Sequence, residues 1–276
     1  MPYRSVDSKE SSEAILKKIK CFVLDLDGTF YLGENMLEGS KEFLEELENQ
    51  SISFKFFTNN SSKNARIYVD KIRKMGYPAK NDMMMISNQV IINYLKENMD
   101  GKKIFVLGND YLKGDFKEAG IELVEEDADV VVVGFDTSLA YSNVLKACDF
   151  IRNGADFLQV NPDFNCPIEN GFMPDCGSIC AMITASTGKK PKCFGKPSPH
   201  ALQYILKYTG FKESEIAFIG DRLYTDIAIG KDNDSTTILV LTGETKIEDL
   251  KDSKVQPSLV FQSLGSLKDV IEEIYK

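Results

Sequence analysis

The chain has 276 residues and is 43% hydrophobic, so it can build packed cores in one large domain or two smaller ones. Its formal net charge of −9 repels nucleic acid and anionic membranes, and neither is an expected partner. No apolar stretch approaches the roughly 18–20 residues of a membrane-spanning helix, and the polar first fourteen residues lack the apolar region of a signal peptide.

Strands and helices alternate from residue 21 onward, which predicts an α/β fold with mostly parallel sheets. The first part of the pattern predicts strands over 21–26 and 52–57 and helices over 39–50 and 62–75. A second series follows, with helices over 87–98, 110–119 and 140–152 and strands over 103–107, 129–134 and 156–160.

Residues 161–177 are rich in Pro, Asn, Asp and Gly, and we expect a loop there, followed by a helix over 178–187. Asp175 in this loop has two interpretations, a contact with a substrate's leaving group or an ordinary helix cap. From about residue 192 the pattern of the first part of the chain returns. It predicts a short strand ending at Phe194, strands over 215–219, 236–241 and 258–261, and helices over 198–208, 223–230 and 264–275.

Cysteine spacing argues against a zinc site, because no C-x-x-C pair occurs. Buried free thiols in a reducing, cytoplasmic setting are the better interpretation. The residues concerned are Cys21, Cys148, Cys166, Cys176, Cys180 and Cys193.

The first predicted strand ends in two acids, Asp25 and Asp27, followed by Gly28 and Thr29. Strand side chains alternate with period two, so both carboxylates point the same way. Such a pair is costly unless a cation lies nearby or one carboxyl stays protonated. Asp25 could attack phosphorus, and Asp27 could protonate a leaving alkoxide and then deprotonate water. The alternative is an ordinary Asp-Gly turn.

Three further segments lie where a predicted strand gives way to a turn, the position at which parallel α/β sheets bind ligands. Thr58-Asn59-Asn60 could bind an anion at a helix N-terminus or simply cap it. Lys196, between a glycine and a proline, could neutralise phosphate or be a solvated surface lysine. Asp221 could complete a metal's carboxylate set or cap the following helix. Asp226 could hold Lys196 or a metal-bound water, or be an ordinary first-turn acid favoured by the helix dipole.

These four segments, in this order, resemble the motifs of the haloacid dehalogenase-like phosphatase superfamily. The insertion between the second and third motifs resembles the α/β cap of the NagD-like, p-nitrophenylphosphatase-like branch. The resemblance implies a Rossmann-like parallel-sheet core over 1–83 and 192–276 and an inserted, smaller α/β cap domain of the C2 type over 84–191.

The resemblance also implies roles for the acids. Asp25 would be the nucleophile and a Mg²⁺ ligand. Asp27 would be the general acid and base and would offer its backbone carbonyl to the metal. Asp221 would ligate the metal, and Asp226 would lie just outside the ligands.

Thr58, Asn59 and Lys196 would bind the transferring phosphoryl group. The expected function is therefore a Mg²⁺-dependent phosphatase that hydrolyses small phosphomonoesters through an aspartyl-phosphate. The substrate stays open among sugar phosphates, nucleoside monophosphates, glycerol phosphate and pyridoxal phosphate. The cap could offer a surface for a homodimer.

Two other functions are compatible with these residues. One is a phosphate-responsive binding or signalling module without turnover, and the other is dehalogenase or phosphonatase chemistry on the same scaffold. Asp27 favours the phosphatase over the module, because a pure switch needs no general acid. Asp27 and the complete carboxylate set likewise favour phosphate esters over carbon–halogen bonds.

Overall fold

A computed structural model describes residues 3–5, 12–168 and 171–276. The chain forms two compact units. The first holds the described residues up to Phe57 together with Val69–Met85 and Ile205–Lys276, and the second holds Thr58–Tyr68 and Ile86–Tyr204. Most of the predicted insertion therefore lies in the second unit, which also takes in two segments that the prediction assigned to the core.

The main sheet has seven strands, and the α/β class expected from the sequence is confirmed. The successive pairs from β15 through β14, β13 and β2 to β5 are parallel, whereas β1 is antiparallel to β15. In sheet order the strands are β1 (Tyr3–Ser5), β15 (Leu259–Phe261), β14 (Thr236–Val240), β13 (Ile216–Gly220), β2 (Cys21–Leu24), β5 (Ser53–Thr58) and β6 (Met84–Ile86).

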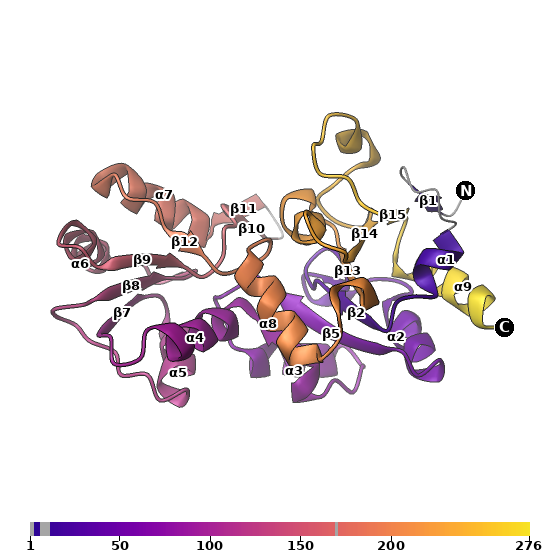
Figure 1. The fold of residues 1–276 in the computed structure, drawn as a ribbon, viewed down its shortest axis with the longest axis horizontal. Helices are drawn as coiled ribbons and strands as arrows, with labels where there is room; N and C mark the ends of the chain where they lie inside the picture. The colour runs from indigo at the N-terminus through magenta and orange to yellow at the C-terminus, as the bar shows by residue number, and fades with distance from the viewer. Residues whose placement is uncertain (1–2, 6–11, 169–170) are drawn as a thin grey trace. The chain divides into compact units, whose positions relative to one another are not determined.

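Strands β2 and β13 are buried along their whole length. Such continuous apolar runs are typical of parallel strands covered on both faces. Helices α2 and α9 pack against each other beside this sheet (Figure 1). Among the described residues, five helices lie wholly or partly in the first unit: α1 (Ser12–Leu16), α2 (Ser40–Asn49), α3 (Ala65–Lys74), α8 (Pro199–Thr209) and α9 (Leu264–Tyr275).

Shorter elements complete the first unit. A small hairpin pairs β3 (Tyr31–Leu32) with β4 (Asn35–Met36) directly after the Asp25–Asp27 segment. Single turns of 3₁₀ helix occur at Asn81–Met83, Glu213–Glu215, Ala228–Gly230 and Ile247–Lys251.

The second unit is built on a parallel sheet of four strands, β12 (Lys192–Cys193), β9 (Asp156–Gln159), β8 (Val130–Val133) and β7 (Ile104–Leu107). Its helices are α4 (Ser87–Asn98), α5 (Asp110–Glu118), α6 (Tyr141–Arg152) and α7 (Cys176–Thr187). Helices α6 and α7 cover one side of the sheet, and Figure 1 shows α4 and α5 on the other.

The core under α6 and α7 contains Phe105, Val131, Cys148, Cys176 and Ile183. Cys176 and Cys180 share one face of α7 and are both buried, as expected for structural thiols. All six cysteines are free thiols. Within the part of the chain that the structure describes, no helix has both the length and the apolar character needed to cross a membrane.

The predicted loop 161–177 was wrong in part, because it contains a β-hairpin of β10 (Asn165–Ile168) and β11 (Gly171–Pro174). Asn170-Gly171 is a strong hairpin signal in the sequence, and the loop-like composition around it concealed that signal. Helix α7 also begins two residues earlier than predicted, because the Asp175 side chain accepts a hydrogen bond from the backbone N–H of Cys176.

The prediction of a regular helix over 223–230 was also wrong. Residues Leu223–Ile227 form a π-helical turn, and a 3₁₀ turn follows it. The backbone N–H groups of Asp226 and Ile227 both donate to the carbonyl of Arg222, and the Asp226 side chain accepts from the Arg222 N–H. Asp226 thus closes a local turn of its own, which competes with regular helix.

Candidate active site

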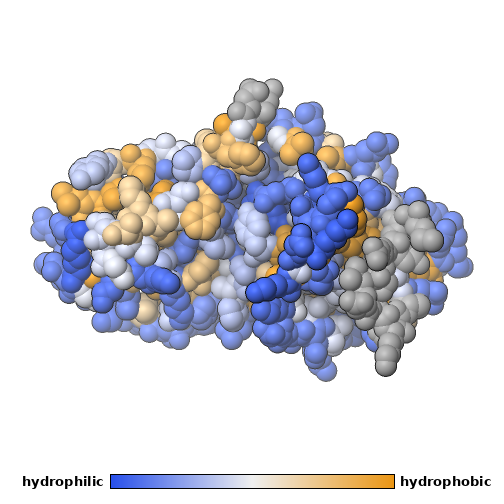
Figure 2. All heavy atoms as spheres, turned by 90° about the horizontal axis from the view of Figure 1, so that it is seen from above, coloured by the Kyte–Doolittle hydropathy of each residue, from blue (hydrophilic) through white to orange (hydrophobic). Residues whose placement is uncertain are grey.

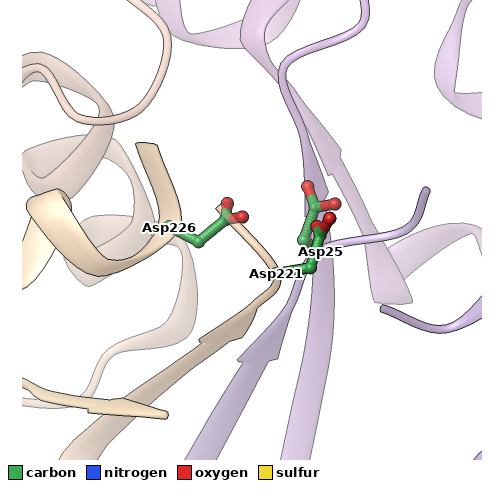
Figure 3. Close-up of side chains that lie close together, drawn as sticks. All are labelled: Asp25, Asp221 and Asp226. Atoms are coloured by element: carbon green, nitrogen blue, oxygen red, sulfur yellow. The ribbon is translucent and has the colours of Figure 1, made fainter. Parts of the chain in front are cut away.

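Three carboxylates meet at one end of the main sheet. Asp25 directly follows β2 and Asp221 directly follows β13, and the two strands are parallel neighbours with Leu24 opposite Ile219. Asp226 comes from the π-helical turn after β13. One carboxylate oxygen of each residue lies within 4.8 Å of the others, and Figure 3 shows the three groups facing the same space.

Asp221 is buried, with 2% of its surface exposed. Its carboxylate accepts a hydrogen bond from the Glu244 backbone N–H at 2.7 Å and from the Thr29 hydroxyl at 3.4 Å. Burial, and then the nearby charge of Asp226, raise the pKa of Asp221 to about 7. Carboxylates this close together favour the binding of a cation.

The loop after β14 closes over Asp221. The Thr242 hydroxyl donates to the carbonyl of Gly28 at 2.6 Å, and the Thr245 backbone N–H donates to the carbonyl of Asp221 at 3.2 Å. A Cβ atom at Gly243 would overlap the Asp221 carboxylate, so only glycine fits this close approach. Nothing in the sequence patterns had pointed to this loop, because the contact joins segments far apart along the chain.

The donor set fits Mg²⁺. This ion prefers hard oxygen ligands, and it is bound by one or two carboxylates together with water and substrate phosphates. A divalent cation among Asp25, Asp221 and Asp226 would balance charges that otherwise repel one another. Sequence reasoning had placed Asp226 outside the ligands, whereas the geometry brings its carboxylate into the same group.

Asp27 is half-buried on the turn that leaves β2. The Tyr31 hydroxyl donates a hydrogen bond to Asp27 Oδ2 at 3.4 Å. The turn is fixed by the Gly28 N–H, which donates to the Tyr31 carbonyl at 2.8 Å, and by three N–H groups that donate to the Leu26 carbonyl. Asp27 therefore sits two residues beyond Asp25 on a well-defined turn.

The second unit brings two other predicted residues together, Asn59 and Lys196. The backbone N–H of Lys196 donates to Asn59 Oδ1 at 2.8 Å, and Asn59 Nδ2 donates to the Lys196 carbonyl at 3.0 Å. Asn59 Nδ2 also donates to Asp163 Oδ2 at 2.9 Å. Both amide hydrogens of Asn59 are thus engaged, so any hydrogen bond from Asn59 to a phosphoryl group would come from its backbone N–H.

Thr58 ends β5 and is buried. Its hydroxyl oxygen accepts a hydrogen bond from the Asn60 backbone N–H at 3.1 Å. Thr58-Asn59-Asn60 do not lie at a helix N-terminus as expected, because α3 begins at Ala65 rather than at residue 62. The segment is instead a turn that its own side chains stabilise, with Asn60 Oδ1 accepting from Ser62.

The capping interpretation of Asp175 is confirmed by its bond to the Cys176 N–H. The same oxygen accepts from Asn161 Nδ2 at 3.1 Å, and Asn161 Nδ2 also donates to Asp163 at 3.2 Å. Sequence reasoning missed Asp163 as a partner of Asn59 and Asn161 as a partner of Asp163. The only available signal was their position in a long polar loop at the end of a strand.

Parallel α/β sheets bind ligands at their carboxyl edge, and clustered aspartates there suit an enzyme that uses a metal ion for phosphoryl transfer or related hydrolysis. Two family models match the chain, one described as haloacid dehalogenase-like hydrolase over residues 22–122 and one described as HAD-hydrolase-like over residues 193–267.

Relatives match over nearly the whole chain. The acid sugar phosphatase of Staphylococcus aureus (strain MRSA252) is 34% identical over 262 residues, which cover 95% of this chain and 100% of that protein. The crystal structure of 4-nitrophenylphosphatase from Thermotoga maritima is 43% identical with a TM-score of 0.90, covering 93% of this chain and 99% of the other. NagD from E. coli K-12 is 30% identical with a TM-score of 0.83, covering 90% and 97%.

The chain therefore belongs to the haloacid dehalogenase-like hydrolases, and its structural neighbours place it in the branch of NagD and the 4-nitrophenylphosphatases. It is an enzyme of the hydrolase class. The resemblance seen in the four sequence motifs is confirmed.

Proposed function

We propose that this chain is a Mg²⁺-dependent phosphatase of small phosphomonoesters that works through an aspartyl-phosphate. The observation that carries the proposal is the cluster of Asp25, Asp221 and Asp226 at the carboxyl edge of the main sheet. Family membership supports it, as do relatives named acid sugar phosphatase and 4-nitrophenylphosphatase.

In the first half-reaction, a carboxylate oxygen of Asp25 attacks phosphorus, and the bond between phosphorus and the ester oxygen breaks. Asp27 gives its proton to that departing oxygen, so the alcohol leaves neutral. In the second half-reaction, Asp27 takes a proton from water as the water oxygen attacks phosphorus. The bond between Asp25 and phosphorus then breaks and inorganic phosphate is released.

The carboxylates of Asp25 and Asp221 and the backbone carbonyl of Asp27 would hold Mg²⁺, with Asp226 beside them. When bound, the ion offsets negative charge on the phosphoryl oxygens, which would otherwise repel the Asp25 carboxylate. The pKa of Asp221, raised to about 7, is consistent with a site built to face a cation.

Lys196, Thr58 and the backbone of Asn59 are proposed to bind the transferring phosphoryl group. Such a contact is needed because the chain carries a formal charge of −9 and repels a phosphorylated substrate at long range. Lys196 is buried, with 3% of its surface exposed, and Asn59 holds its backbone. A buried lysine on a backbone that is held in place is well suited to neutralise a phosphoryl group.

The proposed substrate is a small phosphorylated metabolite, and sugar phosphates are the first class to test because of the named Staphylococcus aureus relative. The proposed location is the cytoplasm. We also propose a homodimer through the second unit, since large apolar side chains are exposed on α6 and α7, among them Tyr141, Leu145 and Met182. Figure 2 shows hydrophobic side chains gathered on that face.

The experiment is hydrolysis of p-nitrophenyl phosphate and a panel of sugar phosphates by the wild-type protein, with Mg²⁺ and with EDTA. We expect turnover that EDTA abolishes and Mg²⁺ restores. A folded, Mg²⁺-treated protein that binds a phosphate analogue but turns over none of these esters would favour a binding or signalling module instead.

A further inference from the structure

We infer that Asp163 is a positioning residue, which acts through Asn59 to hold the backbone of Lys196 in place. The inference rests on the proposed function insofar as Lys196 serves phosphoryl transfer. The hydrogen-bond geometry itself belongs to the second unit and stands apart from the chemistry.

Asn59 forms a two-point clamp on the main chain of Lys196. Its side-chain oxygen accepts from the Lys196 N–H at 2.8 Å, and its side-chain nitrogen donates to the Lys196 carbonyl at 3.0 Å. One amide group therefore pairs with both polar backbone groups of the same residue, much as a neighbouring strand would. The clamp works only if the amide plane of Asn59 is held in one orientation.

Asp163 supplies that orientation. Its Oδ2 atom accepts the remaining hydrogen of Asn59 Nδ2 at 2.9 Å, and the carboxylate is buried, with 2% exposed. A carboxylate accepts hydrogen bonds only, so it excludes the flipped amide, whose oxygen would face it. The nitrogen of Asn59 is thus fixed toward Asp163, and its oxygen is fixed toward the Lys196 N–H.

Asp163 is itself held by Asn161, whose Nδ2 donates to the same Oδ2 atom at 3.2 Å. Ser61 extends the network, because its hydroxyl donates to Asn161 Oδ1 at 2.9 Å and accepts from the Phe135 N–H at 2.8 Å. Buried polar networks of this kind are rigid when every member is satisfied. The turn that carries Lys196 is therefore anchored to the sheet of the second unit.

The close packing at Gly195 supports the same interpretation. A Cβ atom there would lie 2.7 Å from Asn59 Oδ1 and 3.0 Å from the Val160 carbonyl oxygen. The residue before Lys196 thus leaves no room for a side chain between the turn and the clamp. The tight fit is what lets a short side chain such as Asn59 reach both polar backbone groups of Lys196.

The test compares Asp163→Ala, Asp163→Asn, Asn59→Ala and the double variant Asn59→Ala/Asp163→Ala. We expect Asp163→Ala to lower kcat/KM for p-nitrophenyl phosphate by roughly 10–100-fold, since small misplacements of a reacting group cost about that much. Asp163→Asn retains an acceptor oxygen, so its kcat/KM should stay close to that of the wild type. The double variant should lose no more than Asn59→Ala, because Asp163 acts through Asn59.

The matched control is Asp115→Ala. Asp115 also accepts a hydrogen bond from a buried asparagine in the same unit, Asn88, at 2.8 Å, and that pair has no bond to the Lys196 turn. A merely structural role for Asp163 would leave Asp163→Ala with the same kcat/KM as Asp115→Ala. Three results would each overturn the inference. They are equal kcat/KM in Asp163→Ala and Asp115→Ala, equal losses of kcat/KM in Asp163→Asn and Asp163→Ala, and additive losses in the double variant.

A second readout does not depend on turnover. Hydrogen exchange at the Lys196 amide should be faster in Asp163→Ala than in wild type, while amides of β8 keep their protection. Unchanged exchange at Lys196 would contradict the inference even if the phosphatase proposal holds. Faster exchange in a protein that hydrolyses no ester would keep the clamp and reject the proposed function.

Discussion

Asp221 in the first unit and Asp163 in the second are buried to the same extent, each with 2% of its surface exposed, yet they have opposite partners. Asp163 accepts hydrogen bonds from two asparagine amides, which satisfy its charge locally. Asp221 lies beside two other carboxylates, and its pKa is raised to about 7 by burial and by Asp226.

The difference separates two uses of a buried acid. An acid surrounded by donors holds neighbouring groups in position. A buried acid beside other acids gains stability when a cation binds. Burial by itself therefore does not reveal a functional aspartate, whereas the chemical nature of its neighbours does.

Among the variants that test this difference between Asp221 and Asp163, replacing Asp221 should have the largest effect on activity. Asp221→Asn removes a proposed metal ligand, and we expect kcat/KM for p-nitrophenyl phosphate in Mg²⁺ to fall on the order of 10³-fold. The same change removes a buried charge that lies beside Asp226, so the metal-free variant should melt at a higher temperature than wild type. Asp163→Asn is the control and should show neither effect. A metal-free Asp221→Asn protein that is less stable than wild type would contradict the account.

Asp226→Asn should have an intermediate effect. Asp226 belongs to the cluster of three carboxylates but lies in the π-helical turn that follows Asp221. Substitutions of residues beside a metal's main ligands typically cost about 10–100-fold in affinity or activity. The measurement is the Mg²⁺ concentration that gives half-maximal activity. An unchanged half-maximal concentration would place Asp226 outside the metal site.

Gly243→Ala tests the loop that closes over Asp221. The added methyl group would overlap the Asp221 carboxylate, so we expect roughly tenfold weaker activation by Mg²⁺. Gly114→Ala in α5 is the matched control, since a Cβ there meets no atom within 4 Å. Gly114→Ala should leave activity unchanged and stabilise the helix slightly.

The smallest expected effect is the pH dependence of stability. Because the pKa of Asp221 is raised from 3.8 to about 7 in the folded protein, the folded state holds a proton that the unfolded state loses between these values. Metal-free wild type should therefore lose stability relative to Asp221→Asn as pH rises from about 4 to about 7. Excess Mg²⁺ should offset this loss. Thermal unfolding of both proteins across that range, with and without Mg²⁺, measures it.

The sequence predicts the parallel core well because long apolar strands leave a clear pattern, as β2 and β13 show. It predicts Asp25 and Asp221 because both follow such strands directly. The β10–β11 hairpin was missed because its strands carry proline, asparagine and exposed side chains, so the hairpin lacks the pattern of a buried strand.

The contacts of the site were harder to predict than its residues. Asn59 was expected to bind phosphoryl, yet its side chain is fully engaged with Lys196 and Asp163, residues more than a hundred positions away. Gly243 and Glu244 reach Asp221 from a loop without any local motif. Such pairings depend on how strands are ordered in space, which periodicity and spacing along one chain do not encode.

The most direct test of the central claim is the rate of p-nitrophenyl phosphate hydrolysis by Asp25→Asn in saturating Mg²⁺. We predict a loss on the order of 10⁴-fold or more, since the amide cannot serve as the nucleophile, with circular dichroism and melting showing an intact fold. A folded Asp25→Asn protein that retains wild-type turnover, purified free of wild-type enzyme, would contradict it.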